Sequence, residues 1–82
     1  MNQEVFVRRH EARWKELDHL LSRMETGSAD TDRLEGFAPD YRRLCQQLAV
    51  ARHRHYSADV VERLNGLVMR AHSQMYGTRV DG

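Results

Sequence analysis

Apolar residues recur at spacings of three and four positions in three separate stretches of this chain. That period is typical of an amphipathic helix, which turns one apolar stripe toward a core. The first stretch predicts a helix over residues 4–25, with a stop at Thr26-Gly27, because glycine readily adopts the left-handed conformation that ends many helices. The stripe of this helix consists of Phe6, His10, Trp14, Leu17, Leu20, Leu21 and Met24.

Two further helices are predicted over residues 39–55 and 58–76. Pro39 suits the first turn of the second helix, where a missing N–H has no cost, and Ser57 is a good N-cap for the third. The stripe of the second helix consists of Tyr41, Leu44, Cys45, Leu48 and Ala51. The stripe of the third consists of Val60, Val61, Leu64, Leu67, Val68, Ala71 and Met75.

The connection over residues 27–38 carries its own helix signal. Residues 30–32 are of types that cap helix starts, so a short helical turn is predicted there, from which Leu34 packs under the bundle. Short connections between consecutive helices make them antiparallel neighbours. The sequence therefore predicts an all-α fold, an antiparallel three-helix bundle, with residues 1–82 forming a single helical domain.

Composition narrows the class of protein. Hydrophobic residues make up 40% of the chain and charged residues 30%, a balance typical of globular domains rather than disordered chains. No apolar run approaches the length of a membrane span, and the N-terminal residues lack the apolar segment of a secretory signal. The single cysteine, Cys45, has no internal disulfide partner, which fits a reducing compartment. We therefore expect a cytoplasmic domain.

Four polar residues interrupt the apolar stripes: His10 and Arg13 in the first helix, and Arg52 and His55 in the second. In an antiparallel bundle the start of the first helix lies beside the end of the second, so these four residues are expected to gather near one end. Arginine forks there could receive a carboxylate or phosphate of a partner. They are the candidate partner- or anion-binding residues of this chain.

A structural role for these four residues competes with the binding role and is the favoured alternative. Nearby acids such as Glu4, Glu11, Asp59 or Glu62 could neutralise the cluster within the bundle, while the arginine stems cover apolar surface. On this interpretation an Arg52→Ala substitution lowers thermal stability more than it lowers partner binding.

Catalytic and metal-binding patterns are missing from the sequence. His53 and His55 would project about 200° apart on a helix, the wrong geometry for one metal ion. Cys45 lies on the apolar stripe beside Leu44 and Leu48, which predicts a buried, inert thiol. There is no glycine-rich phosphate loop and no hydrolase-like serine motif. We expect no enzyme activity, no metal and no cofactor.

Nucleic-acid binding is the alternative function. Arg42, Arg43 and Arg54 point away from the apolar stripe of the second helix and could form a face for nucleic acid in a free-standing regulatory domain. The net charge, however, is only +1, and acids of the first helix are available to pair with these arginines. A solvated or salt-bridged face is therefore the preferred interpretation.

Protein binding is the function that the pattern favours. Several apolar residues fall outside the ideal stripes, and together they could form a patch for a homodimer or for a helix of another chain. These residues are Val7, Phe37, Val50, Met69 and Tyr76.

Three segments of the chain, residues 6–17, 41–57 and 63–76, together resemble the N-terminal cytosolic region of the stage II sporulation protein M-like family of bacterial membrane proteins. Trp14, the Tyr-Arg-Arg-Leu start of the second segment and its Arg-His-Arg-His-Tyr-Ser end carry the likeness. The resemblance implies a helical module that precedes membrane-spanning helices, and it supplies no catalytic residues. No spanning segment follows Tyr76 here. We therefore expect a non-catalytic cytosolic interaction or scaffolding module, membrane-associated only through a segment absent from this chain.

Overall fold

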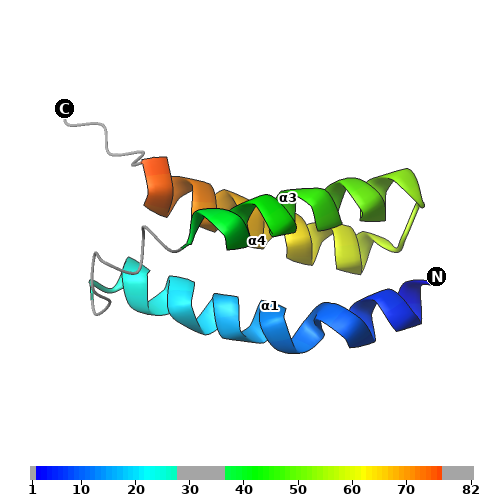
Figure 1. Cartoon of the computed structure of the whole chain (residues 1–82), viewed down its shortest axis with the longest axis horizontal. Coiled ribbons are helices and arrows are strands. Elements are labelled where there is room, and N and C mark those ends of the chain that lie inside the picture. Colours follow the sequence, from blue (N-terminus) through cyan, green and yellow to red (C-terminus); the bar gives the residue numbers. More distant parts are fainter. Residues whose placement is uncertain (1, 28–36, 77–82) are drawn as a thin grey trace.

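The computed structural model describes residues 2–27 and 37–76, which form three helices (Figure 1). These are α1 (Gln3–Glu25), α3 (Ala38–His53) and α4 (Ala58–Tyr76). The described residues contain no strand, and the helices pack together, so the predicted all-α three-helix bundle is confirmed. The helical turn and the packing of Leu34 predicted for the connection fall on residues 28–36, outside the described residues.

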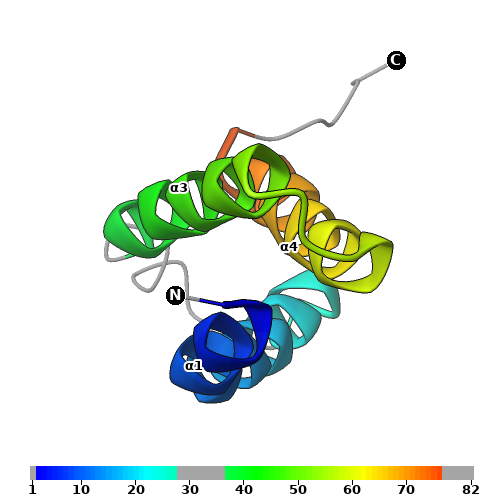
Figure 2. The same cartoon turned by 90° about the vertical axis from the view of Figure 1, so that its right-hand side faces the viewer.

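The three helices run alternately up and down, and α4 packs against both of the others (Figure 1). Seen along the bundle in Figure 2, α4 lies beside α1 and beside α3, and the remaining side of the bundle lies between α1 and α3. Gln3 at the start of α1 is tied to the start of α4, because its Oε1 accepts the backbone N–H of Ser57 at 2.7 Å. At the other end of α1, Glu25 binds Arg70 of α4, so α1 and α4 overlap along most of their length.

The core consists of residues from all three predicted stripes and from the residue before α3. Phe37 is only 1% exposed, although its position outside the ideal stripes suggested a surface patch, so that expectation is wrong. Its carbonyl accepts the N–H of Tyr41 at 2.9 Å, which places Phe37 half within the first turn of α3 and extends the stripe. The core residues are Phe6, Trp14, Leu17, Leu21, Phe37, Leu44, Leu48, Ala51, Val60, Leu64, Leu67 and Ala71.

Helix α3 ends at His53, two residues before the predicted end. The backbone N–H of Tyr56 donates to the carbonyl of Ala51 at 2.9 Å, and the N–H of His55 donates to that of Arg52 at 3.2 Å. His55 has a φ of 56°, in the left-handed region. These two hydrogen bonds and this conformation form a Schellman motif, in which His55 occupies the position that glycine usually takes. The backbone geometry therefore ends the helix before His55.

We expect a His55→Gly substitution to stabilise the domain by about 0.5–1 kcal/mol, because relief of the left-handed strain outweighs the greater freedom of glycine in the unfolded chain. Urea unfolding followed by circular dichroism measures the change. Ala49→Gly is the control, since Ala49 is exposed within α3 and glycine there is expected to cost about 1 kcal/mol. A destabilised His55→Gly variant would contradict the assignment of this turn.

Among the described residues, no helix is both long enough and apolar enough to span a membrane.

Candidate functional site

An open groove of about 480 Å³ is lined by residues of α1 and by residues of and directly after α3. Figure 2 shows the arrangement of these two helices with α4 to one side of them. Two of the lining residues of the groove come from α1 and four from α3, and the seventh, Arg54, is the C-cap residue of α3. We refer to it as the α1–α3 groove. Its lining residues are Phe6, His10, Arg43, Gln46, Gln47, Val50 and Arg54.

The floor of the α1–α3 groove is apolar and aromatic. Phe6 is buried, and its ring centroid lies 5.1 Å from that of His10 and 5.2 Å from that of Tyr56. Val50, on the α3 wall, is 38% exposed. Of the five residues predicted to form an exposed apolar patch, only Val50 lines this groove. The exposed lining of the groove is mostly apolar, with Val50 as its exposed aliphatic side chain above the buried ring of Phe6.

A chain of hydrogen bonds crosses from α1 to α3 beneath this surface. The indole Nε1 of Trp14 donates to Oε1 of Gln47 at 2.7 Å, and Nε2 of Gln47 lies 3.4 Å from Nδ1 of His10. An indole N–H can only donate, so the oxygen of the Gln47 amide must face Trp14 and its nitrogen must face His10. The Nδ1 of His10 is therefore the acceptor, and its proton is on Nε2.

The environment of His10 favours its neutral form. Burial lowers the pKa of His10 below its ordinary value, and the nearby positive charge of Arg9 lowers the pKa further. The floor of the groove is therefore uncharged at neutral pH.

The rim of the groove is basic. Arg43 and Arg54 line it on α3, eleven residues or about 16 Å apart along the helix, and none of the lining residues is acidic. Arg54 makes no side-chain hydrogen bond or ion pair with any described residue. Arg43 approaches only Asp40, at 3.8 Å, and its side chain is 70% exposed. Both arginines can therefore meet a partner.

The four candidate residues predicted from the stripes do not gather at one end. Arg13 extends along the bundle to the first turn of α3, where its Nη2 binds both carboxylate oxygens of Asp40 at 2.8 Å. Arg52 lies about 18 Å further along α3, and His55 lies beyond it. Among the four, only His10 lines the α1–α3 groove. That the others contact a partner stays a prediction.

The structural role expected for Arg52 has no support in the contacts. Its side chain is exposed, and it makes no hydrogen bond or ion pair with any described residue. Glu11, one of the acids expected to neutralise the cluster, instead binds Arg63 of α4 at 3.1 Å. No contact of the Arg52 side chain with a described residue therefore accounts for the loss of thermal stability expected in Arg52→Ala.

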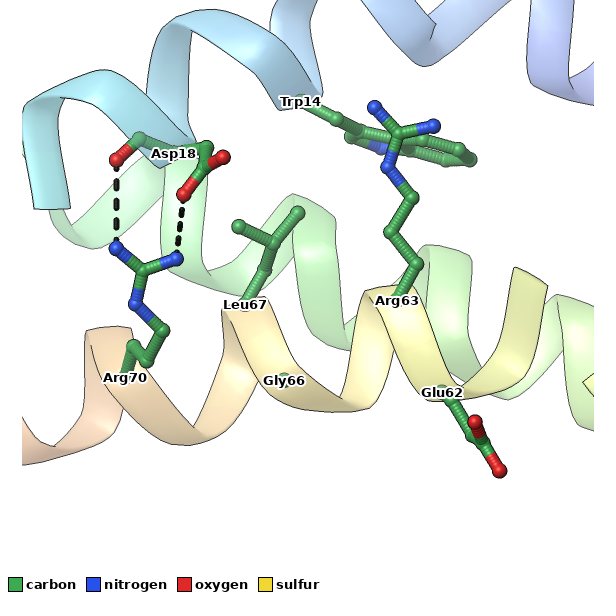
Figure 3. A pocket seen from close by; sticks show the side chains of 7 residues that line it. All are labelled: Trp14, Asp18, Glu62, Arg63, Gly66, Leu67 and Arg70. Carbon is green, nitrogen blue, oxygen red and sulfur yellow. Dashed lines mark hydrogen bonds and ion pairs between the residues drawn. The ribbon is translucent and has the colours of Figure 1, made fainter. Parts of the chain in front are cut away.

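On the opposite side of α1, charges are paired across the α1–α4 interface (Figure 3). A depression of about 200 Å³ lies there, and the guanidinium of Arg63 covers the ring of Trp14 at 5.3 Å. Arg70 forms ion pairs with Asp18 and with Glu25, and the hydrogen bond to Glu25 is the main reason that the pKa of Arg70 is raised. Of the acids of α1 expected to pair with the second predicted helix, Glu11 and Asp18 pair with α4 and Glu16 pairs with Arg13 of α1 itself. None of them pairs with Arg43 or Arg54.

Cys45 is half-buried rather than buried, so the expectation of a fully enclosed thiol is wrong. It lies one position from the buried Leu44, at the edge of the stripe that faces the core. Within residues 2–27 and 37–76, no three histidine, cysteine or acidic side chains are placed to hold a metal ion.

Residues 4–77 match the model of a family described as a domain of unknown function (DUF8413). The match spans all of α3 and α4 and all but the first residue of α1. No curated protein and no solved structure matches the chain.

Proposed function

Because the chain belongs to the DUF8413 family, whose function is unknown, we propose a function from its geometry: a non-catalytic module that binds a helix of a protein partner in the α1–α3 groove. The observation that carries this proposal is the open groove itself, whose exposed lining is mostly apolar and includes the side chain of Val50. An amphipathic helix that lays its apolar face into such a groove is a recurrent mode of protein recognition.

The dimensions of the groove suit a helix. Its lining residues on α3 run from Arg43 to Arg54, about 16 Å or three helical turns. A helix seated between α1 and α3 would complete a four-helix bundle with α4. The volume of about 480 Å³ accommodates several side chains of such a partner.

The chemistry of the lining supports binding rather than catalysis. It contains no serine, threonine, cysteine or carboxylate side chain, so no nucleophile or carboxylate base faces the groove. The Nδ1 of His10 is already engaged by Gln47. The remaining groups are suited to hold a partner.

For the cellular setting, we propose the cytosolic N-terminal part of a bacterial integral membrane protein with a scaffolding role. The resemblance of residues 6–17, 41–57 and 63–76 to the stage II sporulation protein M-like family supports this setting. The open reading frame downstream of Gly82 tests it: apolar spans encoded in frame would support the proposal, and a stop codon with no span would overturn it.

Helix docking is tested by titrating the isotopically labelled domain with a synthetic amphipathic peptide of leucine, alanine and glutamine. We expect NMR shift changes at the groove residues and loss of binding in Val50→Glu, because a carboxylate there would be buried against leucine. Met69→Glu is the matched control, since Met69 is 62% exposed on α4 and outside the groove. Equal loss in both variants, or shifts elsewhere, would refute docking in the groove.

Nucleic-acid binding through Arg42, Arg43 and Arg54 is the competing proposal, and all three side chains are exposed. Only Arg43 and Arg54 line the groove, so the three do not form one surface there. Binding to DNA or RNA that weakens steeply with salt would support this alternative, and no binding at low salt would eliminate it.

A further inference from the structure

We propose that the partner of the α1–α3 groove is an acidic amphipathic helix, with carboxylates on both sides of an apolar stripe. This inference rests on the proposed function and specifies its partner. The juxtaposition that carries it is a basic rim around an uncharged floor: Arg43 and Arg54 stand at the two ends of the α3 wall, and Phe6 lies between α1 and α3 beneath them.

Arg43 and Arg54, the rim arginines, have no close acidic partner among the described residues, unlike the arginines of α4 that face α1. Arg63 and Arg70 each bind an acid of α1 across the interface with α4. By contrast, Arg54 binds no acid among the described residues, and the nearest acid to Arg43 is Asp40 at 3.8 Å. Both arginines therefore retain the capacity for a charge-assisted hydrogen bond with a carboxylate.

Asp40 pairs only loosely with Arg43, at 3.8 Å, because its carboxylate binds Arg13 at a shorter distance. Both of its oxygens accept from Nη2 of Arg13 at 2.8 Å, and its side chain is only 13% exposed. The α1 wall adds positive charge, since Arg9 is close enough to lower the pKa of His10 on the floor. A cationic partner would be repelled from both walls.

The spacing defines the partner more closely. Arg43 and Arg54 are eleven residues apart, so carboxylates separated by about three turns on a docked helix would reach both of them. Apolar side chains between these carboxylates would cover Val50 and pack above Phe6. Because His10 favours its neutral form, these apolar side chains would not bury a charged ring beneath them.

Three synthetic helical peptides test this inference. They share one leucine stripe and carry glutamate, glutamine or lysine beside it. At low salt we expect the glutamate peptide to bind about tenfold more tightly than the glutamine peptide, and added salt to remove the difference, because exposed ion pairs are screened. The lysine peptide is expected to bind most weakly. Isothermal titration calorimetry measures the three dissociation constants.

Charge reversal assigns the effect to the rim. In the double variant Arg43→Glu/Arg54→Glu, the preference should reverse in favour of the lysine peptide. The control is Arg42→Glu/Arg52→Glu, which makes the same change in net charge at two exposed positions of α3 outside the groove. It should keep the preference for glutamate. Reversal in both variants would show a bulk charge effect and overturn the inference.

The remaining outcomes distinguish a failure of the acidic-partner inference from a failure of helix docking in the groove. If the three peptides bind equally well, or lysine binds best, the inference of an acidic partner is overturned while helix docking stands. If none binds, docking in the groove fails as well. A short DNA duplex is the competitor: its displacement of the glutamate peptide from both the wild type and the Arg42→Glu/Arg52→Glu control, which keeps both rim arginines, would assign the rim to nucleic acid and overturn the inference.

Discussion

Replacing Trp14 with alanine is expected to remove a large part of the free energy of unfolding of this domain. Trp14 is 1% exposed and sits where all three helices meet, with the ring of Phe6 at 5.8 Å and the guanidinium of Arg63 at 5.3 Å. Removing a buried tryptophan costs about 3–5 kcal/mol. A domain of this length is stable by only about 4–12 kcal/mol in total.

Far-UV circular dichroism during heating measures this effect, with an expected fall in Tm of about 20 °C. Fluorescence cannot serve, because Trp14 is the single tryptophan of the chain. Trp14→Phe is the informative control: it keeps an aromatic ring in the core but loses the N–H that Gln47 accepts, so we expect a loss of about 1–2 kcal/mol. An unchanged Tm in Trp14→Ala would contradict the central position of this side chain.

The helices were predictable because their apolar stripes follow from the sequence alone. Trp14, Leu44 and Leu64 each belong to a stripe with helical spacing, and each is at most 1% exposed. The period determines which face of a helix is buried, and the short connection over residues 54–57 makes α3 and α4 antiparallel neighbours. Both are local properties of the chain.

The end of α3 was less accessible to prediction, because its signal is not local. A left-handed residue at a helix end is usually glycine, and here it is His55, so no glycine indicates the stop. Phe37 was missed for a related reason: it precedes Pro39, which made it look like part of a connection, although its carbonyl already belongs to the first turn of α3.

Charge pairing was the part of the site that the sequence could not supply. Positions of charged residues follow from a helical wheel, but their partners depend on which helices are neighbours and on the reach of long side chains. Arg13 extends to Asp40 at the start of α3, and Glu11 and Asp18 pair with α4. These pairings use the acids of α1 and Asp40 of α3, and Arg43 and Arg54 remain without a close acidic partner among the described residues. The basic rim of the groove is therefore visible only in the three-dimensional structure.

Replacing Gln47 with leucine is expected to destabilise the domain by about 2 kcal/mol, because the indole N–H of Trp14 loses its acceptor within a buried environment. Urea unfolding measures the loss. Gln46→Leu is the matched control, since Gln46 is exposed at the next position of the same groove wall and should change stability by less than about 0.5 kcal/mol. Equal effects at both positions would mean that the hydrogen bond to Trp14 contributes nothing.

Gln47 also contacts His10, so the pH dependence of the free energy of unfolding tests this second contact of Gln47. Because burial and then Arg9 lower the pKa of His10, the contribution of His10 is fully present above the unfolded pKa of about 6.5 and is lost as pH falls through the folded pKa. His10→Gln should remove this part of the pH dependence.

Gln47→Glu is expected to reverse the direction in which the pKa of His10 is shifted. A carboxylate still accepts the N–H of Trp14, but it faces His10 with negative charge and raises the pKa of that ring instead of leaving it lowered. A raised pKa stabilises the folded state below about pH 6.5 and loses this contribution as pH rises through the folded value. Urea midpoints at about pH 5.5 and about pH 7.5 compare the variant with the wild type. If both lose stability equally on acidification, the side chain at position 47 does not act on His10, which would contradict the contact between Gln47 and His10.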